Sequence, residues 1–517
     1  MASAALVFFI GSSREALATV DDLSDVMAQL TDHVTGVTPL TGPQLEALTV
    51  TFEENRDFLD DTTAVMTEAF DLASLYESVV GPLFINAETR DGFPRESGAD
   101  GHELERAIFA LQQAILDVVY TPANCQVHQA LFDGKIFETS TFFPGACPPP
   151  VDPMVTHAVE IDASNPTMWG KPVCYGPIPA RRPTGLYLAP GSIGEVTVPA
   201  AMVGLGFEIL VGAHAVDKLE YYKPDLLRLD RVSKSFPITD TVTSIANPLG
   251  GGIYIMVPYE ADLGAQTVQV RNVVQAPYYS ATSLRETSLA EWTDTERLHP
   301  GPWADFETEK FMMTLPTSWV YAYADPVTLM QDWDIAMDAF SELVGYTPPH
   351  NVRNLPVLYV QPDRSIQHGA YGTGYPQVNT IYDPDAPTDG NSGHFLLTDV
   401  LGWSTLYHEL GHCQLFSKFP GHEEAMVNLP YVYVATEKFG MPLVDAFTVS
   451  MELGYLENVD VDQAALTWFV TENFRNGLPM DLTHTEQNEV RYQHRGYGRY
   501  VEIAELYGWE VLIDFYH

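Results

Sequence analysis

Two histidines and a glutamate lie within the five residues His408-Glu409-Leu410-Gly411-His412. On a helix, side chains four positions apart share one face, so His408 and His412 can offer imidazole nitrogens to one metal ion. Glu409 lies beside them and can reach a water molecule bound to that metal. The spacing therefore predicts a catalytic zinc site on a helix; the alternative is a pair of hydrogen-bonded core histidines.

A catalytic zinc ion keeps three protein ligands and leaves a fourth position for water. Glu424 is the preferred third ligand, because it would open a second helix that the turn at 418–421 lays antiparallel to the first. Its neighbour Glu423 is then a supporting or solvent residue, and Glu437 is a weaker rival. Alternatively, both neighbouring glutamates only complement the positive end of a helix dipole. Pro430 is expected to kink or end the second helix after the ligand.

The predicted chemistry is hydrolysis at neutral pH, because zinc lowers the pKa of a bound water to about 7 and polarises a scissile carbonyl. Glu409 is expected to act as the general base that takes the water proton and passes it to the leaving amine. A peptide bond is the natural target, and a hydrogen-bond donor should stabilise the developing oxyanion. The sequence leaves this donor open among Tyr375, Tyr433, His484, Tyr492 and His494.

The elements around these residues follow from hydrophobic periodicity. Apolar residues at helical spacing over 395–407 predict a buried helix that carries the histidines. Residues 285–517 mix helical patterns with a few strands, such as 356–360, which predicts an α+β domain around that helix. Residues 185–275 alternate short β runs with Gly and Pro breaks, the pattern of an antiparallel β-sandwich.

The N-terminal region has a different pattern, with helical periodicity and acidic faces. Its periodic segments are 23–30, 58–75 and 104–119. The predicted organisation is therefore a helical accessory region (1–120), a Pro/Cys-rich irregular connection (121–182), a β-sandwich domain (183–282) and a catalytic domain (283–517).

Several motifs occur in the order found in a known family. They are Gly374-Tyr375-Pro376, Gly402-Trp403, the segment 408–412, and Glu424 with Asn428. Further matching segments lie upstream and at the end of the chain: 184–188, 211–214, 247–255, 302–304, 311–316, 329–334 and 508–510. Over roughly residues 183–517 the chain resembles metallopeptidase family sixty, the enhancin-like gluzincins that include viral enhancins and bacterial mucin-degrading O-glycopeptidases.

The resemblance implies a multidomain α+β protein with an N-terminal helical region, an antiparallel β-sandwich and a gluzincin-type zinc metallopeptidase domain. It implies one zinc ion per chain, held by His408, His412 and Glu424, and a glycoprotein substrate of the mucin-like O-glycosylated type. The substrate-binding residues expected on this basis are Gly374, Tyr375, Pro376, Trp403, Tyr433, Tyr492 and His494. Two alternatives stay open: an inactive glycan- or protein-binding member of the same fold, and a peptidase without a glycan requirement.

Composition restricts the partners. The chain has 69 acidic and 26 basic residues and a net charge of −43, which argues against nucleic acid and anionic membranes. No segment is long enough to span a membrane. The apolar run at 4–10, followed by Ala16-Leu17-Ala18, resembles a weak secretion signal without a basic start, and a buried first element is the alternative. A secreted or cell-surface location is therefore expected.

Four cysteines are too few for a disulfide scaffold. Cys125, Cys147 and Cys174 fall in the connection, and Cys125 with Cys147 is the expected bridge in an oxidising compartment. Cys413 follows a predicted ligand and is expected to be an unpaired core thiol. The sequence leaves the oligomeric state open.

Overall fold

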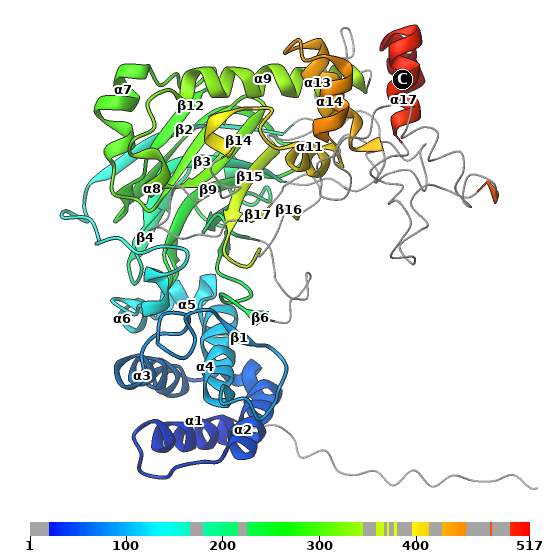
Figure 1. Cartoon of the computed structure of the whole chain (residues 1–517). Coiled ribbons are helices and arrows are strands. Elements are labelled where there is room, and N and C mark those ends of the chain that lie inside the picture. Colours follow the sequence, from blue (N-terminus) through cyan, green and yellow to red (C-terminus); the bar gives the residue numbers. More distant parts are fainter. Residues whose placement is uncertain are drawn as a thin grey trace, which may run out of the picture. The chain divides into compact units, whose positions relative to one another are not determined.

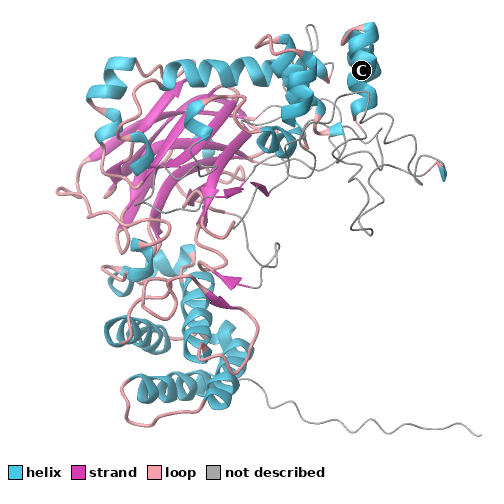
Figure 2. Cartoon of the chain, viewed as in Figure 1, coloured by secondary structure: helices cyan, strands magenta, loops and turns pink. Residues whose placement is uncertain are grey.

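The computed structural model of the chain shows two compact units, Met1–Val119 and Tyr120–His517 (Figure 1). Figure 2 shows that helices dominate the first unit and that strands gather in the second. The structure describes residues 20–165, 179–215, 225–344, 358–366, 370–371, 377–379, 395–412, 426–450, 476–477 and 497–516. None of the described helices is both long and apolar enough to cross a lipid bilayer.

The first unit is built mainly from four helices: α1 (Val20–Val34), α2 (Gly42–Asn55), α3 (Thr63–Val79) and α4 (Glu103–Ala114). Helix α1 packs against α2 and α3, and α2 packs against α4. The predicted N-terminal helical region is therefore confirmed. The periodicity did not predict α2, whose middle is rich in β-branched Thr and Val and carries little amphipathic contrast. A capping box between Thr41 and Gln44 starts it instead.

Two antiparallel sheets form the β-sandwich of the second unit. One sheet has the order β2-β10-β4-β8, with β2 (Thr156–Ser164), β10 (Asp262–Arg271), β4 (Ile193–Thr197) and β8 (Val242–Ala246). The other has the order β11-β3-β9-β5-β7, with β11 (Val274–Gln275), β3 (Ala180–Leu188), β9 (Gly251–Val257), β5 (Glu208–Val211) and β7 (Lys234–Pro237). Strand β2 contacts β3 and β9, and β5 contacts β8, so the two sheets face each other.

The segment 121–182, expected to be irregular, contains regular structure. Strand β2 lies within it and pairs with β10 from Thr156 to Ser164. Two short helices, α5 (Pro122–Val127) and α6 (Gln129–Phe132), precede this strand. The β pattern of β2 is weak in sequence because buried positions occur only in its second half, so pairing with β10 defines it rather than alternation.

The expected disulfide between Cys125 and Cys147 is wrong, because both are free thiols. Cys125 is buried on α5 and Cys147 is half-buried. Burial raises the pKa of each thiol to about 12, so both stay protonated and unreactive at neutral pH.

The region after the sandwich is organised on a six-stranded mixed sheet with the order β12-β13-β14-β15-β17-β16. Its strands are β12 (Tyr278–Ala281), β13 (Trp303–Thr308), β14 (Phe311–Pro316), β15 (Leu358–Asp363), β17 (Gln377–Asn379) and β16 (Ala370–Tyr371). Strand β12 pairs with β13, so this sheet begins before the expected domain boundary at 282. Helix α9 (Pro326–Leu343) packs along β12, β13 and β14 (Figure 1). The observed architecture confirms the predicted multidomain α+β fold.

Candidate metal centre

The predicted helix over 395–407 is interrupted: α10 (Phe395–Thr398) ends before the turn at 399–403, and the histidines lie on a separate helix, α11 (Ser404–Gly411). Trp403 precedes it in an extended conformation, and His412 follows as a cap that keeps right-handed helical angles. The helical path therefore runs through both histidines and places them one turn apart. The turn before the helix is held by Asp399, whose carboxylate accepts the backbone N–H of Leu401 at 2.8 Å. Tyr431 also donates to the carbonyl of Leu401 at 3.0 Å, which joins this turn to the next helix.

His408 and His412 lie side by side. Their ring centroids are 5.0 Å apart at an interplanar angle of 85°, and each residue is 7% exposed. Nδ1 of His408 donates a hydrogen bond to the amide oxygen of Asn428 at 3.0 Å. An amide oxygen can only accept, so Nδ1 carries the proton in this contact; in the neutral ring Nε2 then keeps the lone pair that a metal ligand requires. Two buried, adjacent imidazoles, one with a fixed tautomer, fit a zinc ion by donor type.

Asn428, which belongs to the family motif in the sequence, contacts a predicted metal ligand. It is 3% exposed and lies directly before α13 (Leu429–Glu437). The family motif placed it four residues after Glu424, but its contact with a histidine twenty positions earlier is a property of the packed structure. Pro430, expected to kink or end a helix, lies instead in the first turn of α13, where a missing N–H costs nothing.

Gly411 allows α11 to approach the segment before α13. A Cβ atom at this position would lie 2.9 Å from the carbonyl oxygen of Val427 and 3.2 Å from its Cβ. The neighbour is backbone and cannot rotate away, so a side chain would separate the two segments. The glycine between the two histidines therefore allows Asn428 to come within reach of His408.

Aromatic rings of α9 stack on Tyr407 of α11 and hold this helix in place. Tyr407 is fully buried and stacks on Trp333 and Phe340 of α9, with ring centroids 5.7 and 5.4 Å away. Trp333 continues the stack onto Phe311 of β14 at 4.2 Å. Tyr431 meets Tyr407 edge to face at 5.2 Å. This cluster connects the histidine helix to the sheet through α9 and leaves α11 little freedom to shift.

Helix α11 also lies against one edge of the six-stranded sheet. Strand β16 contacts α11 and pairs antiparallel with β17, in the register Ala370 with Val378 and Tyr371 with Gln377 (Figure 1). Among the described strands, β16 is the last in its sheet. The expected substrate-binding residues Gly374, Tyr375 and Pro376 fall between β16 and β17 in sequence and lie outside the described residues.

Three further expected site residues lie within the described part of the chain. Glu409 is half-buried on α11, and Trp403 packs partly buried against the core at the start of this helix. Tyr433 is 3% exposed in the core, edge to face with Trp509 at 5.1 Å. Burial raises the pKa of Tyr433, and the carboxylate of Glu342 raises it further. The residues outside the described part are Glu423, Glu424, His484, Tyr492 and His494.

The third ligand is therefore not fixed by the structure. Within the described parts of the chain, no three His, Cys, Asp or Glu side chains gather as metal ligands. The rival Glu437 is exposed at the last residue of α13. His408 and His412 supply two donors, and Glu424 stays the predicted third.

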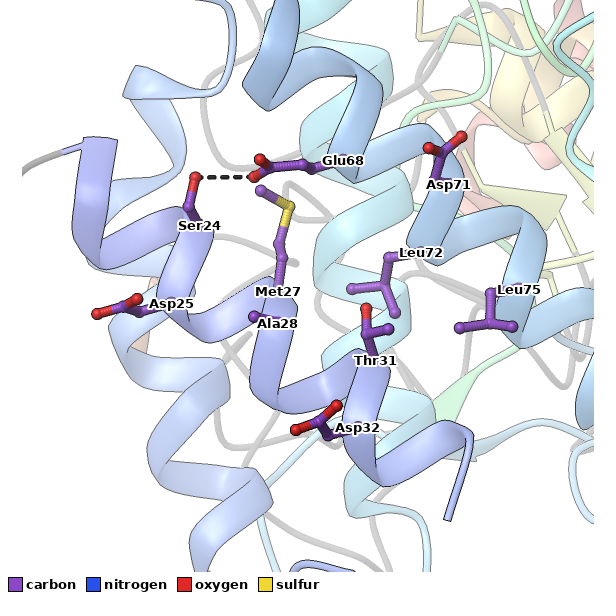
Figure 3. Close-up of a pocket in the computed structure, with 10 residues that line it drawn as sticks. All are labelled: Ser24, Asp25, Met27, Ala28, Thr31, Asp32, Glu68, Asp71, Leu72 and Leu75. Carbon is purple, nitrogen blue, oxygen red and sulfur yellow. Dashed lines mark hydrogen bonds between the residues drawn. The ribbon is translucent and has the colours of Figure 1, made fainter. Parts of the chain in front are cut away.

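A groove of about 500 Å³ lies in the helical unit between α1 and α3 (Figure 3). Four carboxylates surround it: Asp25, Asp32, Glu68 and Asp71. Its floor includes Met27 and Leu72, which are only 2% and 1% exposed. No histidine, cysteine or lysine is among its lining residues. It gives no reason to move the candidate site away from α11.

Comparison with protein families identifies two consecutive domains. Residues 272–451 match the family "Peptidase M60, enhancin and enhancin-like", and residues 177–271 match "N-terminal domain of M60-like peptidases". The first match includes α11 and Asn428, and the second includes most of the β-sandwich. The two matches confirm the family resemblance found in the sequence.

Curated relatives share this region. TRPM8 channel-associated factor 2 from Bos taurus is 31% identical over 295 residues, covering 56% of this chain and 29% of the relative. TRPM8 channel-associated factor 3 from Mus musculus is 27% identical over 318 residues, covering 60% of this chain and 31% of the relative. The chain thus spans about a third of the length of the curated relatives it matches.

Comparison with solved structures finds the IMPa metallopeptidase from Pseudomonas aeruginosa among its matches. It is 13% identical with a TM-score of 0.48, covering 89% of this chain and 53% of that chain. The M60 catalytic domain of ZmpC from Clostridium perfringens, in complex with the sialyl T antigen, is 14% identical with a TM-score of 0.38. That match covers 55% of this chain and 57% of the other.

Proposed function

Because residues 177–451 belong to the M60 family of enhancin-like peptidases, we propose that the protein is a zinc metallopeptidase that hydrolyses peptide bonds in glycoproteins. The observation that carries the proposal is the buried pair His408 and His412 with Asn428 on Nδ1 of His408. A structural pair of core histidines would need neither the neighbouring half-buried glutamate nor a fixed tautomer that keeps Nε2 unprotonated.

In this proposal His408, His412 and Glu424 hold one zinc ion. When bound, zinc supplies a polarising charge for the scissile carbonyl and makes an attacking water more acidic. Glu409 takes the proton from that water and delivers it to the leaving amine. Asn428 keeps the imidazole of His408 in the ligand tautomer, and the aromatic cluster around Tyr407 keeps the helix in place.

The substrate is proposed to lie along β16, because this strand contacts α11 and is the last described strand at its edge of the sheet. An extended peptide can use the backbone groups of such a strand. Gly374, Tyr375, Pro376, Trp403, Tyr492 and His494 are the proposed substrate-binding residues. Tyr433 is left out of this set, because its ring is buried against Trp509. The oxyanion donor is proposed from Tyr375, His484, Tyr492 and His494.

A mucin-like, O-glycosylated substrate is proposed from the family resemblance. With a net charge of −43, the protein should favour neutral glycans over sialylated or sulfated ones, unless salt screens the repulsion. Such substrates are extracellular, so the proposal includes a secreted or cell-surface location.

A second candidate function is binding without catalysis. The curated relatives are named as factors associated with the TRPM8 channel, and a binding role of this kind would need the fold but not the zinc chemistry. A peptidase without a glycan requirement is a third candidate. The three differ in what they require of Glu409 and of the substrate glycan.

The test compares the purified protein with its Glu409→Gln variant on an O-glycosylated mucin and on the deglycosylated form, with zinc content measured for both proteins. The proposal expects cleavage of the glycosylated substrate alone, and loss of that cleavage in Glu409→Gln with zinc retained. Cleavage of both substrates would support the peptidase without a glycan requirement. Zinc-free protein without cleavage would support the binding candidate.

A further inference from the structure

Three polar side chains of the β-sandwich domain hold three successive residues of β15 in the catalytic sheet. Arg181 of β3 donates through Nη1 to the side-chain oxygen of Gln361 at 3.0 Å. His214, which follows β5, bonds through Nε2 to the carbonyl oxygen of Pro362 at 2.8 Å. Arg228 donates to the carboxylate of Asp363. These three contacts join the two family domains within the second unit.

The contact between Arg228 and Asp363 is bidentate. Nε of Arg228 donates to one carboxylate oxygen and Nη2 donates to the other, each at 2.9 Å. The side chains are 1% and 0% exposed. Nη1 of the arginine also donates to the carbonyl oxygen of Asp230 at 2.9 Å, so the guanidinium is held on both sides. Asp363 in turn accepts the backbone N–H of Ser365 at 2.9 Å, which shapes the turn after β15.

Arg181 and His214 are equally buried, at 3% and 1% exposure. The guanidinium of Arg181 lies over the ring of Tyr359 in β15, 3.8 Å from its centroid, and donates to the carbonyl of Ala213 at 2.9 Å. Burial lowers the pKa of His214 to about 4, so its ring is neutral at pH 7 and Nε2–H donates to the carbonyl of Pro362.

A buried ion pair is a weak source of stability, because desolvation offsets much of its attraction and apolar residues of equal volume do as well. Its directional bonds, however, fix the positions of both partners more narrowly than apolar contact does. The residues held in this way are those that pair with β17, in the register Gln361 with Gln377 and Asp363 with Asn379. Strand β17 pairs with β16, and β16 lies against the histidine helix α11.

We propose that Arg181, His214 and Arg228 are positioning residues through which the β-sandwich domain sets the place of β17 and β16 beside α11. The sandwich is then part of the substrate-binding apparatus rather than a separate module. The consequence for substrate binding rests on the proposed peptidase function, whereas the effect on the two strands does not.

The test uses the full chain with Arg228→Met and Asp363→Asn combined. This pair of changes removes both buried charges. The new amide side chain at position 363 still has an oxygen that can accept the backbone N–H of Ser365. The matched control combines Arg182→Met with Asp162→Asn. That ion pair joins β3 and β2 within the sandwich at 3.0 Å, and Asp162 accepts the N–H of Ser164 in the same way.

Amide hydrogen exchange followed by mass spectrometry is the first measurement. In the double variant Arg228→Met/Asp363→Asn, called the Arg228 variant below, the amides of β16 and β17 should exchange about tenfold faster or more, while β9 and α11 keep their protection. The control variant should leave β16 and β17 unchanged. Unchanged exchange in the Arg228 variant, or an equal increase throughout β9 and β14, would overturn the proposal, because the ion pair would then serve only general stability.

Hydrolysis of an O-glycosylated peptide, with zinc content, is the second measurement. KM should rise severalfold in the Arg228 variant, with kcat and zinc content close to those of the parent protein, because ground-state binding is what the strands provide. A fall in kcat at unchanged KM would contradict the substrate-positioning role. If the parent protein cleaves nothing, the proposed function fails and hydrogen exchange alone decides the positioning of β16 and β17.

Discussion

Nδ1 of His408 bonds to the amide oxygen of Asn428, a contact that would orient the imidazole as a zinc ligand in the proposed site. Asn428→Ala should therefore lower zinc affinity about 10- to 100-fold, the usual effect of losing a partner behind a metal ligand. Asn428→Asp keeps an oxygen acceptor at the same place and should retain most of the affinity. Competition between the protein and a zinc chelator measures both variants. Equal zinc affinity in Asn428→Ala and the parent protein would show that the hydrogen bond does not orient the ring for metal.

Gly411 sets the approach of α11 to Val427. Gly411→Ala gains about 0.5–1 kcal/mol of helix propensity, but the new Cβ would lie 2.9 Å from a backbone oxygen. Overpacking of this kind costs about 1–3 kcal/mol, so we expect a net loss of stability together with weaker zinc binding. Urea unfolding of the parent and variant measures the first effect.

Gly98→Ala is the control for this substitution, because a Cβ there would meet nothing within 4 Å. It should change the free energy of unfolding by less than about 0.5 kcal/mol. If Gly411→Ala behaved like the control, the close approach of the two segments would not depend on glycine.

At the scale of elements, β13 carries two buried carboxylates on one face. Asp305 accepts hydrogen bonds from Tyr254 at 3.1 Å and Thr314 at 2.6 Å. Glu307 accepts hydrogen bonds from Tyr278 and, at 2.9 Å, from Ser280. Burial outweighs these bonds, and it raises the pKa of Asp305 to about 6 and that of Glu307 to about 7.

Both pKa values are higher in the folded protein than the ordinary values of 3.8 and 4.5. The two carboxyls therefore contribute stability that is complete below about pH 4 and is lost as pH rises through 6 to 7. Glu307→Gln removes one of them. The variant should match the parent near pH 4 and be more stable at pH 8, by up to about 3 kcal/mol.

Urea unfolding of the parent and of Glu307→Gln at several pH values measures this difference. Glu309→Gln changes an exposed carboxylate two residues further along and should leave the pH dependence unaltered. A constant difference between Glu307→Gln and the parent from pH 4 to pH 8 would mean that Glu307 titrates normally.

The chain has two compact units, and α11, the helix that carries the proposed zinc ligands, belongs to the second. Each unit has its own core, so calorimetry should resolve two unfolding transitions. Free zinc at 100 times its dissociation constant should stabilise the second unit by about 2.7 kcal/mol and leave the first unchanged. His408→Ala should abolish the zinc effect. A zinc-dependent shift that persisted in His408→Ala would place the binding elsewhere in the chain.

Features that depend on short-range spacing could be predicted from the amino-acid sequence. The helical register of His408, Glu409 and His412 follows from a separation of four residues, and α11 has the predicted path. Hydrophobic periodicity likewise predicted the helical region and the sandwich, and short motifs predicted the family. The sequence could not reveal α2, since a cap rather than periodicity starts it, or β2, since a partner strand defines it.

Contacts between residues far apart in the chain depend on how the elements pack, and the sequence did not predict them. Asn428 reaches His408 across 20 positions, and Arg228 reaches Asp363 across 135. The burial of Tyr433 and the raised pKa values on β13 likewise arise when separate elements pack together. Periodicity tells which face of an element is apolar, but not which other element covers that face. The proposed chemistry of the histidine helix can therefore be predicted from the sequence. Which residues orient and position that helix depends on packing.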